Sequence, residues 1–307
     1  MQFSNQPIWN GVRIGGLAFA DCNRICGYQL EWLLGYTFSS TLLLPLRASR
    51  MPFTVSHAAA FLPLRRLNLV WSAFIVGSMA PDFPYIIGNT YYRDLGHQFP
   101  GLIDFTIPSS LIALWLFHNI IKRPVIQLLP AGMQQRLRDQ TGHFSFLPAR
   151  RFLAILGSMV LGIATHIIWD SFTHSYSWPW RHFAFLRSWV RVPIVNHRMP
   201  MFGALQYGST IVGMLALAIW VWLWYRRSPL PAAPAPRSQP KSYFGLAVAM
   251  LAIAAAAGAI RALSQIGMPE TTARVDGFIL VYAVTSLAVA FWQLLLYCVL
   301  VSSYQVW

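Results

Sequence analysis

Five long apolar runs constrain the fold of this chain more than any other feature. They are Leu102–Ile121, Phe152–Phe172, Phe202–Tyr225, Tyr243–Ile260 and Phe278–Val301. A helix of about 20 apolar residues spans the hydrocarbon core of a bilayer, and it satisfies its backbone polar groups internally. Hydrophobic residues make up 56% of the chain and charged residues only 10%, which excludes an ordinary soluble domain. We therefore expect an all-α protein, a polytopic membrane helix bundle with about five to six transmembrane helices.

A sixth apolar run, Leu67–Gly88, is interrupted by Pro81, Asp82 and Pro84. Proline removes a backbone donor and breaks a helix interior. Irregular backbone at membrane depth is tolerated only where protein or water satisfies it. We expect the outer end of this run to be non-helical and to line a polar cavity or to lie at the interface.

The domain organisation follows from composition. Residues 227–242 contain the Pro-rich sequence L-P-A-A-P-A-P-R-S-Q-P and predict an extended linker. Residues 51–226 carry all eight histidines and are predicted to form the helical membrane domain with the functional site. Residues 243–307 are predicted to form a C-terminal transmembrane hairpin. Residues 1–50 are only loosely apolar and form a doubtful leader, with Met51 as an alternative start of the protein.

The net charge of +14 does not predict a nucleic-acid partner. The basic residues are spread among the loops, and no basic stripe with stacking aromatic residues is present in the sequence. Lys and Arg are more frequent in residues 122–151 and 226–241 than in the loops of the opposite side. The positive-inside rule places those two segments on the cytoplasmic side of the membrane.

The segment T-H-I-I-W-D-S-F-T-H places His166, Asp170 and His174 four residues apart, so that they share one face of a helix. Imidazole and carboxylate groups at this spacing can bind one cation together. The predicted topology also brings Asp82, His97 and Asp104 to the same, non-cytoplasmic end of the bundle. Ionisable groups at membrane depth cost several kcal/mol unless they are paired or metal-bound. The sequence therefore predicts a polar cluster, and a candidate metal site, near one leaflet.

Four segments carry a resemblance to a known family: M-P-F-T-V-S-H-A-A-A at 51–60, G-S-M-A-P-D-F-P-Y at 77–85, residues 97–108, and T-H-I-I-W-D-S-F-T-H. Over roughly residues 51–226 the chain resembles a family of bacterial integral-membrane proteins with a domain of unknown function. That family resembles membrane-bound metal-dependent hydrolases and, more distantly, the zinc-dependent phospholipase C superfamily. The resemblance implies a protein of the bacterial inner (cytoplasmic) membrane with membrane lipids as its partners. The charge bias of the loops places its site toward the non-cytoplasmic side.

The resemblance also implies a ligand set and a chemistry. The implied metal ligands are His57, Asp82, His97, His166, Asp170 and His174. They would hold Zn²⁺, or Mn²⁺, as one or two ions, because the superfamily's terminal amine and H-x3-E ligands have no counterpart here. Asp82 is the candidate general base, and Asp104 would accept an N–H from a ligating histidine and so fix its tautomer. A single helix through residues 67–88 would separate His57 from the rest, so the resemblance requires a short hairpin that turns at Pro63–Asn68.

Three classes of function remain open. The first is a membrane-embedded metal-dependent hydrolase that acts on a phosphoester, for example a lipid, near the outer leaflet, with Arg181 and Arg187 as phosphate contacts. Those arginines, and the tryptophans around them, are alternatively lipid anchors. The second class is a non-catalytic scaffold with a structural His/Asp cluster. The third is a proton- or ion-coupled carrier.

Overall fold

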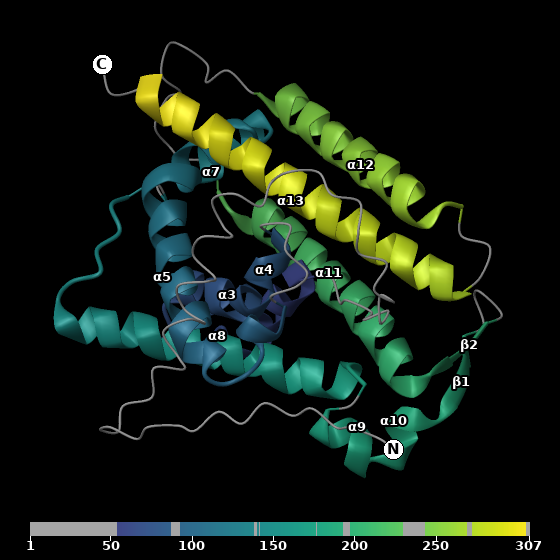
Figure 1. Cartoon of the computed structure of the whole chain (residues 1–307). Coiled ribbons are helices and arrows are strands. Elements are labelled where there is room, and N and C mark those ends of the chain that lie inside the picture. Colours follow the sequence, from purple (N-terminus) through teal and green to yellow (C-terminus); the bar gives the residue numbers. More distant parts are fainter. Residues whose placement is uncertain are drawn as a thin grey trace, which may run out of the picture. The chain divides into compact units, whose positions relative to one another are not determined.

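The computed structural model describes residues 54–86, 93–137, 140, 142–175, 177–192, 197–229, 243–268 and 272–304. Nearly all of its ordered elements are helices (Figure 1). Five helical stretches are long and apolar enough to cross a membrane: Leu102–Gln127, Ala149–His182, Met201–Arg227, Phe244–Ile266 and Gly277–Ser302. Each corresponds to one predicted run, so the prediction of an all-α polytopic bundle is confirmed. The predicted leader, residues 1–50, lies outside the described residues, as does most of the predicted linker.

The elements follow one another in a simple order. The first group consists of η1 (Thr54–Ala60), α2 (Phe61–Leu64), α3 (Trp71–Met79), η2 (Ala80–Asp82), α4 (Phe83–Ile86) and η3 (Arg93–Gly96). The first membrane-length stretch follows this group. It comprises η4 (Leu102–Thr106), α5 (Ile107–Leu116), η5 (Phe117–Ile121) and α6 (Lys122–Gln127). The remainder are α7 (Ala131–Leu137), α8 (Ala149–Thr173), α9 (Trp178–His182), α10 (Ala184–Arg187), β1 (Trp189–Val192), β2 (His197–Pro200), α11 (Met201–Arg227), α12 (Phe244–Ile266) and α13 (Thr272–Tyr304).

The interrupted sixth run does not cross the membrane as one helix. Helix α3 has only 9 residues, and it pairs with η1 and α2 as a hairpin whose turn exposes Arg65 and Arg66. The hairpin required by the resemblance is therefore present. As far as Ile86, the last described residue of this run, the expected non-helical backbone is wrong: Ala80–Asp82 forms a 3-10 turn that leads directly into α4 (Phe83–Ile86). Proline is accepted there because the first turn of a helix does not use its backbone N–H groups.

The hairpin packs against α8 through glycines. A Cβ atom on Gly77 would clash with the backbone carbonyl of Met159, and one on Gly162 would clash with the carbonyl of Phe74. The two helices therefore approach backbone to backbone, as small residues allow in membrane proteins. The Val70 N–H also donates to the Ser158 hydroxyl at 2.9 Å. These contacts set the position of α3 along α8.

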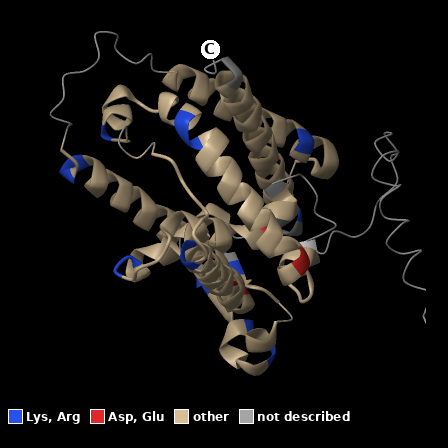
Figure 2. Ribbon diagram, turned by 90° about the vertical axis from the view of Figure 1, so that its left-hand side faces the viewer, with Lys and Arg blue, Asp and Glu red and all other residues tan. Residues whose placement is uncertain are grey.

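The remaining helices surround this pair. Helix α11 packs along η1, where a Cβ on Gly213 would lie 3.0 Å from the Ser56 carbonyl oxygen. Helices α12 and α13 run antiparallel side by side (Figure 1). Helix α13 in turn contacts α4, η5 and α6. Most of each long helix carries no charged residue (Figure 2), as a lipid-facing surface requires.

The close approach of α3 and α8 makes a stability prediction. Gly162→Ala should destabilise the protein by about 1–3 kcal/mol, because the added methyl group must push apart two backbones. Thermal unfolding of the purified protein in detergent measures the change. Gly157→Ala is the matched control on the same helix, since a Cβ there meets nothing within 4 Å. Equal effects of the two substitutions would contradict the proposed packing.

Candidate metal centre

Helix α8 supplies the first two residues of the site. His166 is fully buried and Asp170 is nearly so, and His166 Nε2 lies 3.4 Å from Asp170 Oδ2 one turn later. His166 Nδ1 lies 2.7 Å from the backbone carbonyl oxygen of Ser78. A carbonyl oxygen can only accept a hydrogen bond, so Nδ1 of His166 must carry the proton. In the neutral ring Nε2 then has a free lone pair, which faces the cluster. The carbonyl is available because α3 ends at Met79 and leaves its last acceptors without helical donors.

The hairpin supplies His57, and the 3-10 turn η2 that follows α3 supplies Asp82. Asp82 is buried, and its Oδ2 atom accepts a hydrogen bond of 2.8 Å from the Thr54 hydroxyl. The His57 ring stacks on His166 with centroids 4.0 Å apart. His57 Nε2 lies 3.3 Å from Asp170 Oδ1. Both arms of the hairpin thus reach the residues of α8.

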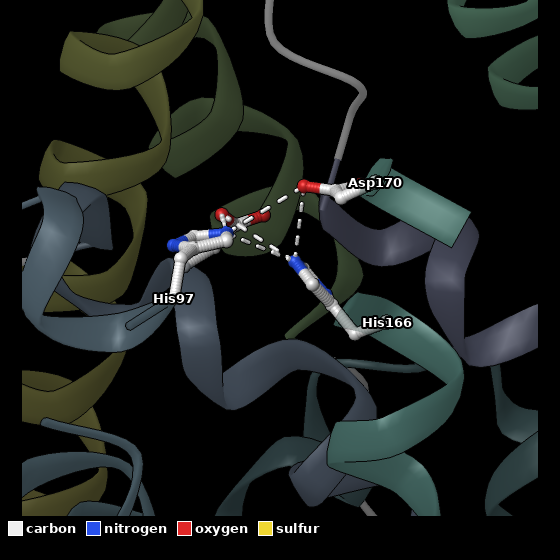
Figure 3. A group of neighbouring side chains, drawn as sticks. His97, His166 and Asp170 are labelled. Carbon is white, nitrogen blue, oxygen red and sulfur yellow. Dashed lines mark hydrogen bonds and ion pairs between the residues drawn. The ribbon is translucent and has the colours of Figure 1, made fainter. Parts of the chain in front are cut away.

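His97 closes the group from the segment after η3 (Figure 3). Its Nε2 atom lies 3.3 Å from His166 Nε2, 3.5 Å from Asp82 Oδ1 and 3.5 Å from Asp170 Oδ2. The preceding Gly96 packs so closely on η2 that a Cβ would clash with the Pro81 carbonyl. Only glycine therefore lets His97 approach the cluster from this direction.

The spacing of these atoms suits a single cation. Asp82, His97, His166 and Asp170 each offer one ligand atom, and all four atoms lie within 4.8 Å of one another. Four ligands at about 2.0–2.1 Å from a tetrahedral zinc ion would lie roughly 3.3 Å apart. His166 Nε2 lies 3.3 Å, 3.4 Å and 3.8 Å from the ligand atoms of His97, Asp170 and Asp82. We name these four residues the His/Asp cluster. They form a buried group that could hold a metal ion.

Two buried atoms at this cluster lack hydrogen bonds within the described part of the chain. His57 Nε2 and Asp170 Oδ1 form an ion-pair contact at 3.3 Å, but neither has a hydrogen-bond partner there. His57 belongs to the short helix η1, outside the five membrane-length stretches. Burial, and next the neighbouring His166, lower the pKa of its imidazole to about 4, so the ring is neutral at pH 7 and can act as a ligand. Unsatisfied buried polar atoms are rare in proteins, and a cation would give both atoms a partner.

The other predicted site residues lie farther out. His174 ends α8, and its Nδ1 atom lies 3.0 Å from the Asp170 backbone carbonyl and 3.7 Å from Asp170 Oδ2, at the edge of the cluster. Asp104 is exposed, and in the described part of the chain it makes no ion pair with the clustered histidines. The structure therefore does not bring it to the site. Arg187 donates to the backbone carbonyls of Trp180 and Arg181, and both arginines are exposed.

Sequence reasoning missed two residues that contact the site. Thr54 lies three positions before His57, a spacing that could have identified it as a neighbour on the same helical face. Ser78 acts through its backbone carbonyl, for which no side-chain signal exists.

Fold and site together define an integral membrane helix bundle with a buried His/Asp group that could hold a metal ion. The chain belongs to the family described as Domain of unknown function (DUF4184), whose model matches residues 51–299. No curated protein and no solved structure matches the chain. The resemblance to that membrane family is thus confirmed, whereas the wider likeness to metal-dependent hydrolases gains no support from these comparisons.

The cluster geometry predicts metal content. Protein purified without added metal should carry a near-stoichiometric divalent ion, measured by elemental analysis. Asp170→Ala should reduce the metal to background, because it removes a carboxylate that lies between His166 and His97. Asp104→Asn is the control, since it removes an exposed carboxylate outside the cluster. Undiminished metal in Asp170→Ala would exclude the cluster as the metal site.

The hydrogen bond from Thr54 to Asp82 makes a separate prediction. Thr54→Val keeps the shape of the side chain but removes the donor to Asp82 Oδ2. Partners that orient a ligand typically contribute 10–100-fold to metal affinity, so we expect a loss of about 10–100-fold. Competition with a chelator of known affinity measures this change. Thr54→Ser should keep most of the affinity, because it keeps the hydroxyl. An unchanged affinity in Thr54→Val would show that the hydroxyl does not position Asp82.

Proposed function

We propose that this protein is a membrane-embedded metal-dependent hydrolase that cleaves a phosphoester, with phospholipid as the favoured class of substrate. The observation that carries the proposal is the His/Asp cluster, with four ligand atoms within 4.8 Å of one another and two buried, unsatisfied atoms at its edge. Zn²⁺, or Mn²⁺, suits this mixture of imidazole and carboxylate ligands. A bound ion would make a water acidic and polarise a phosphoryl oxygen.

The side chains of the cluster divide naturally into holding and reacting groups. His166 is the most rigid member, since it is fully buried and bonded to the Ser78 carbonyl. Asp82 has one oxygen bonded to Thr54 and the other facing His97. A carboxylate held in this way can accept the proton of an attacking water, so we assign Asp82 the role of general base as well as ligand.

Exposure indicates where a substrate would approach. The side chains of His97 and His174 are 18% and 17% exposed, whereas that of His166 is fully buried. A substrate would therefore enter past His97 and His174. His174 lies at the end of α8, where α9 and the exposed Trp178 follow. Aromatic residues of this kind typically lie at headgroup level, which favours a lipid phosphoester. The positive-inside bias of the loops assigns this end to the outer leaflet.

A structural metal site is the second candidate. The low exposure of Asp82 and Asp170, 3% and 6%, is typical of closed metal sites that stabilise a fold. In that case the metal would hold the hairpin against α8, and the protein would act as a membrane scaffold. Both candidates require a bound metal, so turnover is the property that separates them.

Turnover of a lipid panel tests the proposal. The full chain in nanodiscs should release phosphate or headgroup from at least one phospholipid. A chelator should abolish this release and zinc should restore it. Asp82→Asn should lower the rate by about 10²–10⁴-fold, the usual contribution of a general base, whereas Asp104→Asn should be as active as the wild type. Stoichiometric metal without turnover of any lipid or soluble phosphodiester would overturn the hydrolase and leave the structural site.

A further inference from the structure

The segment between α8 and α11 forms a small surface that packs against these two helices. It contains α9, α10 and the antiparallel strands β1 and β2, and it connects the site-bearing end of α8 to the beginning of α11 (Figure 1). The segment therefore lies at the same membrane face as the His/Asp cluster. This placement holds whichever side of the membrane that face occupies.

The strand register pairs two like charges. Arg191 lies directly opposite Arg198, and both side chains are exposed. Directly opposite residues of an antiparallel pair share one face with Cβ atoms about 4.5–5.5 Å apart, and like charges there are destabilising. The sequence contains no Asp or Glu between Asp170 and Glu270. Within the described residues, no carboxylate forms an ion pair with either arginine. Among the described residues the pair therefore has no ion-pair partner.

Aromatic side chains accompany the arginine pair. Trp189 lies two residues before Arg191 on the same strand, so it shares the face of the pair, and it is 70% exposed. Trp178 and Phe185 in the neighbouring short helices are 65% and 53% exposed. Exposed tryptophan beside arginine is the composition that fits the headgroup layer of a bilayer. A site for a free anion would need the arginines but not these apolar rings.

We propose that the face of β1–β2 formed by Trp189, Arg191 and Arg198 binds the phosphate group of an anionic phospholipid. Two guanidinium forks on one face can each donate two hydrogen bonds to phosphate oxygens. The anion supplies a counter-charge to both arginines, and Trp189 lies in the adjoining interfacial layer. This binding does not depend on the proposed hydrolysis, although it would concentrate anionic lipid beside the cluster.

The test compares two double variants of the full chain in detergent. Phosphatidylglycerol, but not phosphatidylcholine, should raise the thermal unfolding temperature of the wild type. Arg191→Gln with Arg198→Gln should weaken the apparent affinity for phosphatidylglycerol by about tenfold or more, as expected for lost charge-assisted hydrogen bonds. Arg226→Gln with Arg227→Gln is the matched control, because these arginines are exposed at the opposite end of α11. It removes the same charge and should keep the wild-type response.

Further measurements separate the alternatives. Equal weakening in both double variants would show a nonspecific effect of net charge and overturn the proposal. Protection by inorganic phosphate at the same concentration as lipid would overturn the lipid assignment in favour of a free anion. Arg191→Lys with Arg198→Lys should recover part of the affinity, because it keeps the charge and loses the planar fork. Unchanged metal content in the glutamine variant would confirm that the fold and cluster remain intact.

Discussion

Asp82 and Asp170 lie buried among imidazoles inside a bundle whose long helices are otherwise almost uncharged. Removing a carboxylate from water costs several kcal/mol, and partners repay this cost only when their geometry is good. Neither aspartate obtains enough partners from its own helix. Asp82 needs Thr54 and His97, and Asp170 needs His57 and His97 in addition to His166. The fold therefore depends on bringing the hairpin, η3 and α8 together at one point.

Small residues make this convergence possible. Gly77 and Gly162 let α3 and α8 meet backbone to backbone, and Gly96 lets the His97 segment approach Pro81 equally closely. All three glycines lie near the cluster, whereas Gly157, on an exposed part of α8, meets no neighbour. Lipid tails are as apolar as the side chains of the helices, so the hydrophobic effect does not drive helices together in a membrane. Close van der Waals packing of backbones is therefore a strong source of helix association there. The glycines permit the close packing of the hairpin, the His97 segment and α8, and the side chains of the cluster link the same three segments.

The cluster and the arginine-bearing strands lie at the same end of the bundle, so they could act on the same lipid molecules. A metal held by the cluster would supply the chemistry, and the surface around Trp189 and Arg191 would bind anionic lipid beside it. The two proposals remain separable, because each rests on a different set of residues and each has its own control. Lipid binding without hydrolysis would be consistent with a scaffold whose metal site stabilises the hairpin.

The sequence alone determined the five membrane-length helices and the pairing of His166 with Asp170, because both depend on local periodicity along one helix. It also indicated His57, through a family resemblance. Only the tertiary structure decided that Asp104 stays exposed, that Thr54 bonds to Asp82, and that the Ser78 carbonyl sets the proton position of His166. These features depend on where separate segments meet. A backbone carbonyl is the same in every residue, so the sequence cannot indicate which one will bond to a histidine. Local pattern carries no information about such contacts until packing has brought the segments together.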